Sequence, residues 1–325
     1  MTMGHENFAT FVDLAPAAED FRTAVLAGFA RPRKSIPCRF LYDARGSELF
    51  TAICETPEYY LTRTETGILE SRAGEIAALA GPGCHLVEFG SGAGTKVRIL
   101  LAAFADPAAY TAIDISAAAL NWAAESVTAA FSDVDVTAVC ADFTDPGRLP
   151  ASLFAPPARR IGFFPGSTIG NLTPREAVDF LRGCRAMLGP GSAMIVGVDL
   201  KKDAARLNAA YNDSAGVTAE FTLNLLARMN RELGANLDAS RFRHEAFYAP
   251  AEGRMEIYIQ SLMDQIVSVA GRRVSFARFE RIHVEYSCKY TVPEFQELAA
   301  RAGFSPAACW TDADSLFSVH YLNAD

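Results

Sequence analysis

A glycine-rich turn beside an acidic residue is the stretch of this sequence with the clearest chemical potential. The segment LVEFGSGAGTK places Glu88, Gly90, Gly92 and Gly94 where a short apolar run meets a helical pattern. Glycines at such a turn permit a positive φ and a close approach of the backbone to a ligand. The E-x-G-x-G-x-G spacing lacks the third glycine of the dinucleotide fingerprint, so it disfavours a nicotinamide cofactor. On its own, the turn would equally suit a structural role.

Two more apolar runs carry acidic residues near their ends. Asp114 lies in YTAIDIS, and Asp142 with Phe143 ends VDVTAVCADF. A carboxylate at the first position can accept from both ribose hydroxyls, and one at the second can accept from an adenine amino group. Because ligands of open α/β sheets bind at the carboxyl ends of the strands, the three positions should meet at one edge. Together they predict an adenosine pocket in which the Phe143 ring covers the base.

A second set of residues has the donors that an amino-acid ligand needs. The segment FFPGSTIGN (163–171) leads through small residues to Asn171, and Tyr211 follows in AAYND. An amide and a phenol can both donate to a ligand carboxylate. The alternatives are that Asn171 caps the helix expected from Thr173 onward, and that Tyr211 is a buried core phenol.

An alternating run near the end of the chain suggests a polar strand face. Glu285 and Ser287 are two residues apart, so both should project from one face of a strand. By the same alternation that face also carries Arg281, His283 and Lys289, and the other carries Ile282, Val284, Tyr286 and Cys288. A carboxylate and a hydroxyl can together fix both nitrogens of an imidazole. The alternative is an ordinary solvated strand face.

These residues require a sheet to position them. Apolar runs alternate with helical patterns along the chain, and we expect strands at 85–90, 110–116, 134–143, 159–167 and 192–200. Continuous apolar strands that alternate with helices are typical of a parallel sheet covered on both faces. The predicted fold class is therefore α/β.

The remainder of the chain has a different texture. Residues 203–233 have a continuous helical pattern, and the alternating runs 244–249, 254–263, 265–271 and 273–290 predict antiparallel strands with one solvated face. The last segment, a helix and two strands, is expected to return to the parallel sheet. We therefore predict a nucleotide-type domain at 64–200 and 291–325, and a second α+β unit at 1–63 and 201–290.

Composition argues against several other classes of function, although the net charge leaves room for a local basic patch. The net charge of −8 over 325 residues argues against nucleic acid as a partner. No apolar run approaches the ~20 residues that span a bilayer, and MTMGHENFATFVD lacks a signal pattern, so we expect a cytoplasmic protein without a membrane partner. Seven cysteines and five histidines show no CxxC or HxxxH spacing, so no disulfide framework or metal site is expected.

The arrangement of 85–200 resembles the class I S-adenosylmethionine-dependent methyltransferases, which have a Rossmann-like domain. The resemblance implies that S-adenosyl-L-methionine is the cofactor and that Glu88 belongs to the turn that binds it. Gly90 and its neighbours would then face the methionine portion, and Asp114 the ribose. The adenine would lie against Asp142 and Phe143.

A second resemblance covers nearly the whole chain. It rests on six segments that occur in this order: FLYDARGSELFTAICETPEYYLTRTE (40–65), FPGSTIGN (164–171), DLKKD (199–203), LNAAYND (207–213), RMEIYIQS (254–261) and VEYSCKY (284–290). With the glycine turn, these are similar to the histidine-specific Nα-methyltransferases of ergothioneine biosynthesis. The resemblance implies a monomer that transfers three methyl groups to the α-amino group of L-histidine, giving N,N,N-trimethylhistidine (hercynine).

The same resemblance implies roles for individual residues. Asn171 and Tyr211 would hold the substrate α-carboxylate. The imidazole contacts would be Tyr59, Glu285 and Ser287, and Met255 would line the same pocket. The presence of both Glu285 and Met255 favours histidine over an indole-bearing substrate, because an indole ring has no acceptor nitrogen and needs no carboxylate facing a second nitrogen.

Methyl transfer from a sulfonium is an in-line displacement, so positioning supplies most of the catalysis. Tyr42 is the candidate that orients the amine beside the cofactor; a phenol is neutral near pH 7, so it is not assigned as the base. Tyr42 and Phe50 could face the methylated ammonium through cation–π contacts. Gly166 and Thr168 would bound the methyl-transfer site. Lys96 could hydrogen-bond the cofactor carboxylate, or it could be an exposed first-turn lysine.

Two rival functions remain open at this level. One keeps the chemistry and changes the acceptor to another amino acid or amine. The other is a catalytically silent methyltransferase fold that serves as a binding module. The intact turn from Glu88 to Gly94, with Asp114 and Asp142, argues against decay of the cofactor site.

Overall fold

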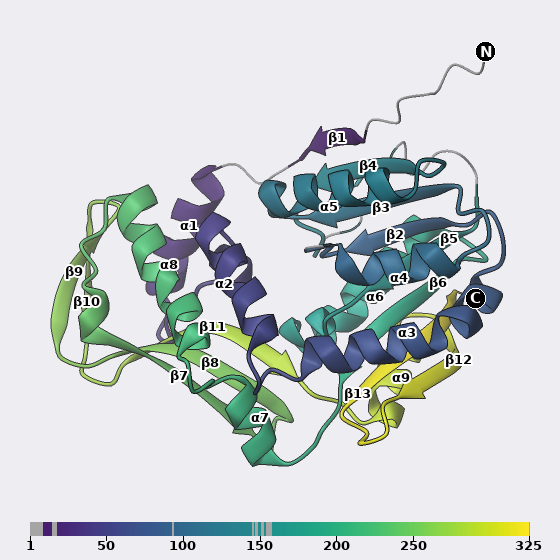
Figure 1. Cartoon of the computed structure of the whole chain (residues 1–325). Helices are drawn as coiled ribbons and strands as arrows, with labels where there is room; N and C mark the ends of the chain where they lie inside the picture. The colour runs from purple at the N-terminus through teal and green to yellow at the C-terminus, as the bar shows by residue number, and fades with distance from the viewer. Residues whose placement is uncertain are drawn as a thin grey trace. The chain divides into compact units, whose positions relative to one another are not determined.

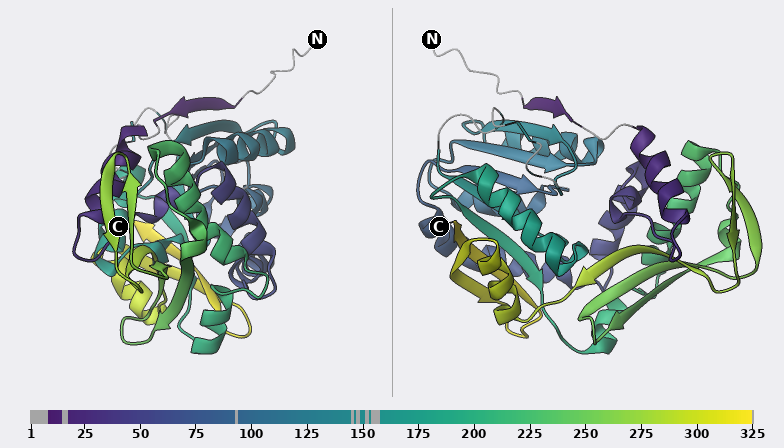
Figure 2. Two further views of the ribbon diagram at one scale, coloured as in Figure 1. Left: turned by 90° about the vertical axis from the view of Figure 1, so that its left-hand side faces the viewer. Right: turned by 180° about the vertical axis from the view of Figure 1, so that it is seen from behind.

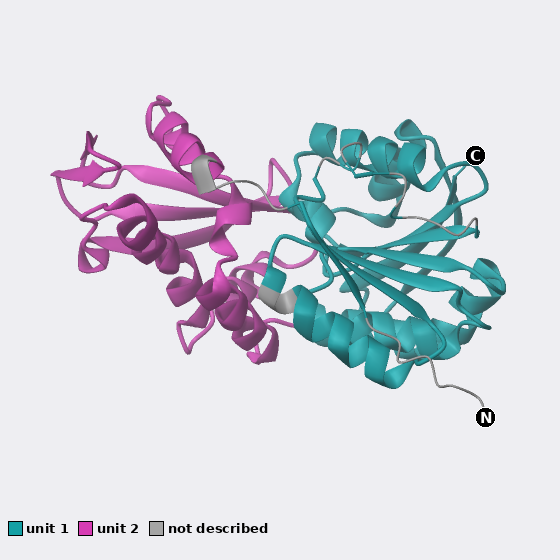
Figure 3. Ribbon diagram, turned by 90° about the horizontal axis from the view of Figure 1, so that it is seen from above, with its two compact units in different colours: residues 1–15, 61–201, 289–325 teal, residues 16–60, 202–288 magenta. Residues whose placement is uncertain are grey.

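The chain forms two compact units, which are coloured separately in Figure 3. The computed structural model describes residues 9–14, 18–92, 94–144, 146, 149–150, 153 and 158–324. The first unit comprises Met1–Ala15, Leu61–Lys201 and Lys289–Asp325, and the second comprises Pro16–Tyr60 and Lys202–Cys288.

The domain boundaries expected from the sequence, 64–200 with 291–325 and 1–63 with 201–290, differ from these units most at the N-terminal end. Strand β1 (Thr10–Asp13) pairs in parallel with β4 of the first unit. The sequence places it in the second unit because a run of four residues carries too little periodicity to predict a strand.

An eight-stranded sheet forms the centre of the first unit, in the order β1-β4-β3-β2-β5-β6-β13-β12. Its strands after β1 are β2 (His85–Phe89), β3 (Ala109–Asp114), β4 (Asp135–Cys140), β5 (Arg160–Phe164), β6 (Ala193–Asp199), β12 (Phe304–Thr311) and β13 (Phe317–Ala324). The pairings from β1 to β6 are parallel, whereas β13 is antiparallel to both β6 and β12. The prediction that the C-terminal segment returns to the parallel sheet is confirmed.

Helices cover both faces of this sheet, as expected for strands that are apolar throughout. They are α3 (Leu61–Ala80), α4 (Thr95–Ala103), α5 (Ala117–Ala130), α6 (Pro174–Leu188) and α9 (Val292–Arg301). Figure 1 shows α3, α4 and α5 on one face, and the view from behind in Figure 2 shows α6 and α9 on the other. Every residue of β2 and β6 is buried, which explains why these strands lack polar alternation. The predicted α/β Rossmann-like class is confirmed.

The second unit is α+β. Its helices are α1 (Ala18–Phe29), α2 (Ala44–Glu55), α7 (Ala204–Ala210) and α8 (Val217–Leu233), with short 3-10 turns η1 (Cys38–Leu41) and η5 (Ala239–Arg241). Its strands are β7 (Phe242–Ala249), β8 (Arg254–Ser261), β9 (Gln265–Val269), β10 (Arg272–Phe276) and β11 (Arg281–Cys288). The order β11-β8-β7 forms an antiparallel sheet, and β9 pairs with β10 as a separate hairpin.

Two elements expected to be continuous are interrupted. The helical pattern at 203–233 breaks into α7 and α8, because the Asp213 carboxylate accepts the N–H groups of Val217 and Thr218 and starts a new helix. Gly216, with φ +75°, makes the turn before it. The run 273–290 likewise divides into β10 and β11 around Phe279, whose φ is +68°.

Candidate active site

The glycine turn after β2 has the backbone conformation that its composition suggests. Gly90, Gly92 and Gly94 all have positive φ, of 73°, 49° and 65°. A Cβ on Gly90 would lie 3.4 Å from the Phe143 ring, so a larger residue would press on the aromatic group. A Cβ on Gly92 would meet no atom within 4 Å. The backbone at Gly92 is therefore open to a ligand, whereas Gly90 brings the ends of β2 and β4 together.

Asp114, the last residue of β3, lies beside this turn. Its carboxylate accepts the N–H of Gly92 at 3.0 Å and the N–H of Ser116 at 2.9 Å. Burial raises the pKa of this carboxyl, and the backbone hydrogen bonds from Ser116, Gly92 and Ile115 oppose the rise. These bonds fix the carboxylate at the carboxyl edge of the sheet, as the sequence predicted.

Asp142 and Phe143 follow β4 at the same edge. One Asp142 oxygen accepts the backbone N–H of Thr144 at 3.0 Å and its hydroxyl at 2.6 Å. The Phe143 ring packs edge-on against Phe164 of β5, with centroids 5.7 Å apart. Three neighbouring strands thus present the glycine turn, Asp114 and the Asp142–Phe143 pair at one edge.

Glu88 lies behind the turn in a wholly buried position. Its carboxyl accepts the hydroxyl of Tyr110 at 2.5 Å. Burial raises the pKa of Glu88 to about 8, although the Tyr110 hydrogen bond and the charge of Lys96 oppose the rise. The Glu88 side chain is therefore anchored to β3 through Tyr110, and its direct contact with a cofactor stays a prediction.

Lys96, in the first turn of α4, is not the exposed lysine that the sequence left possible. Its side chain is 16% exposed and its ammonium pairs with the carboxylate of Glu65, which is fully buried. The ammonium also lies 3.7 Å from the position that a Cβ on Gly166 would occupy. Lys96 therefore links the glycine turn to the segment after β5.

That segment, FFPGSTIGN, forms a tight turn and a 3-10 helix, η4 (Thr168–Asn171). Gly166 and Ser167 both have positive φ, of 76° and 57°. The Thr168 hydroxyl donates to the carbonyl of Pro165 at 2.8 Å, which closes the turn. The structure thus places Gly166 and Thr168 at the carboxyl end of β5, beside Lys96.

Asn171 is not the cap of the helix that follows. Thr173 caps α6 in a capping box with Glu176, in which each side chain accepts a hydrogen bond from the other residue's backbone. Among the described residues, the Asn171 side chain makes no hydrogen bond in this structure. The capping alternative is therefore wrong, and the amide remains available as a donor.

The second unit gathers its predicted residues into an aromatic cluster. The Tyr42 ring meets Phe50 at 5.6 Å and Phe221 at 5.4 Å between centroids, and Phe50 meets Tyr59 at 6.3 Å. Tyr59 in turn lies 6.2 Å from Tyr211. Four aromatic residues named from two segments, 40–65 and 207–213, therefore form one cluster.

The position of Tyr42 is set by the residue that follows it. Asp43 caps α2 by accepting the N–H of Gly46 at 2.8 Å, and it also accepts from Asn224 at 2.8 Å and Arg231 at 2.5 Å. Burial raises the pKa of Asp43, but these hydrogen bonds outweigh it and hold the pKa below its usual value. The charged Asp43 thereby ties the start of α2 to α8.

Tyr211 joins the aromatic cluster to the sheet. Its hydroxyl donates to Ser287 Oγ at 2.7 Å, and both residues are buried. Tyr59 is also buried, and its pKa is raised well above the usual value by burial and then by Tyr211, Cys54, Tyr42 and Glu285. Glu285 therefore lies close enough to Tyr59 to act on its phenol.

The face of β11 that carries Glu285 and Ser287 is not the one that alternation predicted. A bulge between His283 and Glu285 shifts the register, so that Glu285 pairs with Ile257 and Ser287 with Met255. His283 lies opposite Tyr258, and its ring contacts Tyr286 at 3.9 Å between centroids on the other face.

The predicted grouping of Glu285 and Ser287 with Arg281 and His283 is therefore wrong. Their predicted separation from Tyr286 is correct. One unpaired residue reverses the side-chain alternation of a strand, which places Glu285 and Ser287 among the apolar residues of β8. Ser287 is buried there and Glu285 is half-buried, so this face is not an ordinary solvated one.

Two residues of these clusters received no role from the sequence. Phe221 of α8 contacts both Tyr42 and Phe50, but in a helical pattern it looks like any core residue. Glu65 ends a segment used for the family resemblance, yet nothing local distinguishes it from a surface glutamate of a helix. Only the tertiary structure identifies either residue.

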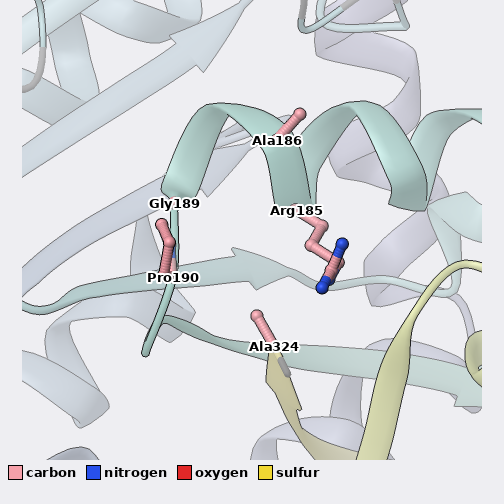
Figure 4. A pocket seen from close by; sticks show the side chains of 5 residues that line it. All are labelled: Arg185, Ala186, Gly189, Pro190 and Ala324. Carbon is pink, nitrogen blue, oxygen red and sulfur yellow. The ribbon is translucent and has the colours of Figure 1, made fainter.

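A small pocket elsewhere on the first unit is separate from these residues. It is lined by Arg185, Ala186, Gly189, Pro190 and Ala324, and Figure 4 shows Arg185 extending from α6 toward Ala324. The Ala324 N–H donates to the Ser192 carbonyl, just before β6 begins. The pocket therefore lies at the amino edge of the parallel strands, away from the glycine turn.

The described residues lack two further features. No cluster of three or more His, Cys, Asp or Glu side chains suited to a metal ion occurs among them. Of the helices that the structure describes, none combines the length and the apolar character needed to cross a membrane.

Comparison with known proteins places this chain among methyltransferases. The sequence profile of a family described as "histidine-specific methyltransferase, SAM-dependent" matches residues 21–324. The chain is 40% identical over 319 residues to the histidine N-alpha-methyltransferase of Mycolicibacterium smegmatis, covering 96% of this chain and 98% of that protein. It is 38% identical to the protein of the same name from Mycobacterium tuberculosis, covering 92% of this chain and 93% of that one.

A longer fungal relative shows the same similarity in one part of its length. The chain is 31% identical to ergothioneine biosynthesis protein 1 of Neurospora crassa, covering 97% of this chain and 36% of that protein. The profile match and the mycobacterial relatives both extend across the two compact units. The chain therefore belongs to the family of histidine-specific, S-adenosylmethionine-dependent methyltransferases.

Proposed function

We propose that this protein transfers three methyl groups from S-adenosyl-L-methionine to the α-amino nitrogen of L-histidine. The product is N,N,N-trimethylhistidine (hercynine), a step of ergothioneine biosynthesis. The observation that carries the proposal is the hydrogen bond between the buried Tyr211 and Ser287, two residues from the half-buried Glu285, in a chain of this family. The names of the relatives support the substrate and the pathway.

The carboxyl edge of the first unit fits S-adenosyl-L-methionine. The open backbone at Gly92 leaves room for the methionine portion, and the Asp114 carboxylate is held where it can accept from ribose hydroxyls. We assign Asp142 to the adenine amino group and Phe143 to the face of the adenine ring. When bound, the cofactor supplies a methyl group on a positively charged sulfur, which makes that methyl electrophilic.

Recognition of the histidine side chain falls to the second unit. The Glu285 carboxylate can accept a ring N–H, while the Ser287 hydroxyl can donate to or accept from the other nitrogen. Tyr59 and Met255 bound the same place with buried, uncharged surface. Because buried polar groups that lose their ligand partner carry a desolvation cost, this set discriminates against side chains without two ring nitrogens.

The remaining groups act on the amino and carboxylate ends of the substrate. Tyr211 and Asn171 are assigned as donors to the α-carboxylate. Because the carboxylate and the amine are both attached to the α-carbon, holding the carboxylate also positions the amine. Tyr42 orients the amine, directly or through water, and its neutral phenol can accept a hydrogen bond from it.

As methylation proceeds, the nitrogen becomes a permanent cation. The faces of Tyr42, Phe50 and Phe221 can stabilise such a charge by roughly 0.5–2 kcal/mol each through cation–π attraction. This interaction helps to keep the methylated nitrogen where the starting amine was bound. Such retention suits three successive methyl transfers.

The oligomeric state, location and partners stay predictions. A monomer in the cytoplasm that binds histidine and its mono- and dimethylated forms is consistent with the acidic net charge of −8. We propose that it has neither a nucleic acid nor a membrane as partner. Size-exclusion chromatography with light scattering measures the oligomeric state.

Titration calorimetry tests the substrate assignment. Histidine, tryptophan and tyrosine are titrated into the protein with and without S-adenosylhomocysteine. The assignment predicts that histidine binds at least about tenfold more tightly than either competitor, since two ring hydrogen bonds are lost without an imidazole. Equal or tighter binding of tryptophan or tyrosine would show that the acceptor is another amino acid.

A further inference from the structure

Glu65 is a carboxylate of the first unit that the proposed chemistry leaves without a role. It lies in the second turn of α3, and its side chain is fully buried. Both of its oxygens accept from the Gly166 N–H, at 2.8 and 3.0 Å, and one pairs with Lys96. A glutamate is almost never fully buried unless it is paired. The role of the Glu65 carboxylate must therefore involve its two partners, Gly166 and Lys96.

The space for this carboxylate is made by a glycine on a different element. A Cβ on Gly197, in β6, would lie 1.9 Å from Glu65 Oε1. No side chain can occupy that position while the carboxylate stays in place, because interiors are packed to near-crystalline density. The position of the Glu65 carboxylate thus depends on both α3, which carries it, and β6, which leaves space for it.

The turn that Glu65 holds is a strained one. Gly166 and Ser167 are consecutive residues with positive φ, and Ser167 is not glycine. Such a conformation persists only where its surroundings enforce it. Glu65 holds the Gly166 N–H from one side, and the Ser167 hydroxyl accepts the backbone N–H of Asp199 at 2.9 Å from the other.

Glu65 also determines where the Lys96 ammonium lies. A lysine that is only 16% exposed needs a counter-charge, because an unpaired buried cation is costly. The partner it finds is the carboxylate that holds Gly166. One side chain therefore fixes both the ammonium beside the glycine turn and the backbone of the turn after β5.

We propose that Glu65 is a positioning residue for methyl transfer. It is fully buried and acts through others: through Gly166 on the turn that bounds the methyl-transfer site, and through Lys96 on the cofactor end of that site. The inference rests on the proposed function, because that function gives Gly166 and Lys96 their roles. A merely structural Glu65 would affect unfolding but not the rate of the folded enzyme.

Two substitutions separate these roles. Glu65→Gln keeps the volume and one oxygen that can accept the Gly166 N–H, but it loses the charge. Glu65→Leu loses both. Glu70→Gln, on the exposed side of the same helix, is the matched control. Glu65→Gln keeps the test decisive if the leucine variant fails to fold.

The first readout is hydrogen exchange of the protein without ligands. The peptide that contains Gly166 to Thr168 is followed by mass spectrometry. We expect its exchange to become at least about tenfold faster in Glu65→Leu, and to rise less in Glu65→Gln, since the turn loses its fixed acceptor. Unchanged protection of this peptide in Glu65→Leu would show that Glu65 does not stabilise the turn.

The second readout is steady-state kinetics well below the unfolding temperature. We expect kcat to fall at least about tenfold in Glu65→Leu and less in Glu65→Gln, with KM for histidine within about twofold of the wild type. Wild-type kcat in both variants, despite faster exchange, would overturn the positioning role. If the wild-type protein forms no methylated histidine, the proposed function fails. The exchange result would still show whether Glu65 stabilises the turn at Gly166.

Discussion

Glu285 is the residue on which recognition of the imidazole depends most. The bulge in β11 places it among apolar residues, near the phenol of Tyr59. A hydrogen bond to a charged group in such surroundings contributes about 1.5–3 kcal/mol. Glu285→Ala should therefore weaken histidine binding by roughly tenfold to a hundredfold. Calorimetry measures the change, with cofactor affinity as the internal control, and unchanged histidine affinity would refute this contact.

Asn171 and Thr173 provide a matched pair for separating binding from folding. Thr173→Ala removes the cap of α6 and should cost about 1 kcal/mol of unfolding free energy while leaving histidine affinity unchanged. Asn171→Ala should do the reverse, weakening histidine binding with little change in stability. Denaturant unfolding measures the stability of both variants, and calorimetry measures their affinity for histidine. If Asn171→Ala proved the more destabilising and bound histidine normally, the carboxylate role would be wrong.

Glu88 predicts a pH dependence of stability. In the unfolded chain it ionises near its usual pKa of 4.5, whereas burial raises its folded pKa to about 8. Between these values the unfolded state binds fewer protons, so stability falls as pH rises. Glu88→Gln cannot ionise, and wild type should lose up to roughly 4 kcal/mol relative to it from pH 5 to pH 8. Urea unfolding across this range measures the slope, and a constant difference would show that Glu88 is charged when folded.

At the scale of elements, the turn after β5 is supported from behind by an ion pair. Lys289 and Asp199 are both fully buried, 2.7 Å apart, and the Asp199 N–H donates to Ser167. Removing one member of a buried pair leaves an uncompensated charge and costs about 3–5 kcal/mol.

Lys289→Met should therefore destabilise the protein by about that amount. The double variant Asp199→Asn with Lys289→Met leaves no lone charge and should recover part of the loss. Thermal and urea unfolding measure both proteins. Equal stability of the single and double variants would show that the charge of Asp199 is compensated by other groups.

The elements also show what a sequence can and cannot reveal. Strands such as β2 and β6 were predictable because their continuous apolar runs reflect burial on both faces. The break between α7 and α8 had a usable signal in Asn212-Asp213-Ser214 and Gly216, a cluster typical of turns.

The bulge in β11 had no such signal. The residues around Val284 alternate regularly in the sequence, and only pairing with β8 forces one of them out of register. Glu65 was hidden for a similar reason. Its burial depends on the space left by Gly197, which is distant in the sequence.

At the scale of the whole chain, the family match and the two compact units agree on a division of labour. The first unit carries the groups suited to the cofactor, and the second carries the aromatic and polar groups suited to an imidazole. The mycobacterial relatives align along more than nine-tenths of this chain, so the similarity extends across both units. Together they make histidine methylation the central claim.

The most direct test is incubation of the purified protein with S-adenosyl-L-methionine and L-histidine, followed by mass spectrometry. We expect products heavier than histidine by about 14, 28 and 42 Da, with the last accumulating and fragmentation placing all three methyl groups on the α-nitrogen. Parallel incubations contain tryptophan, tyrosine or Nα-blocked histidine, which should remain unmodified. Unmodified histidine, or methylation of its ring or of another amino acid instead, would contradict Nα-trimethylation of histidine by this protein.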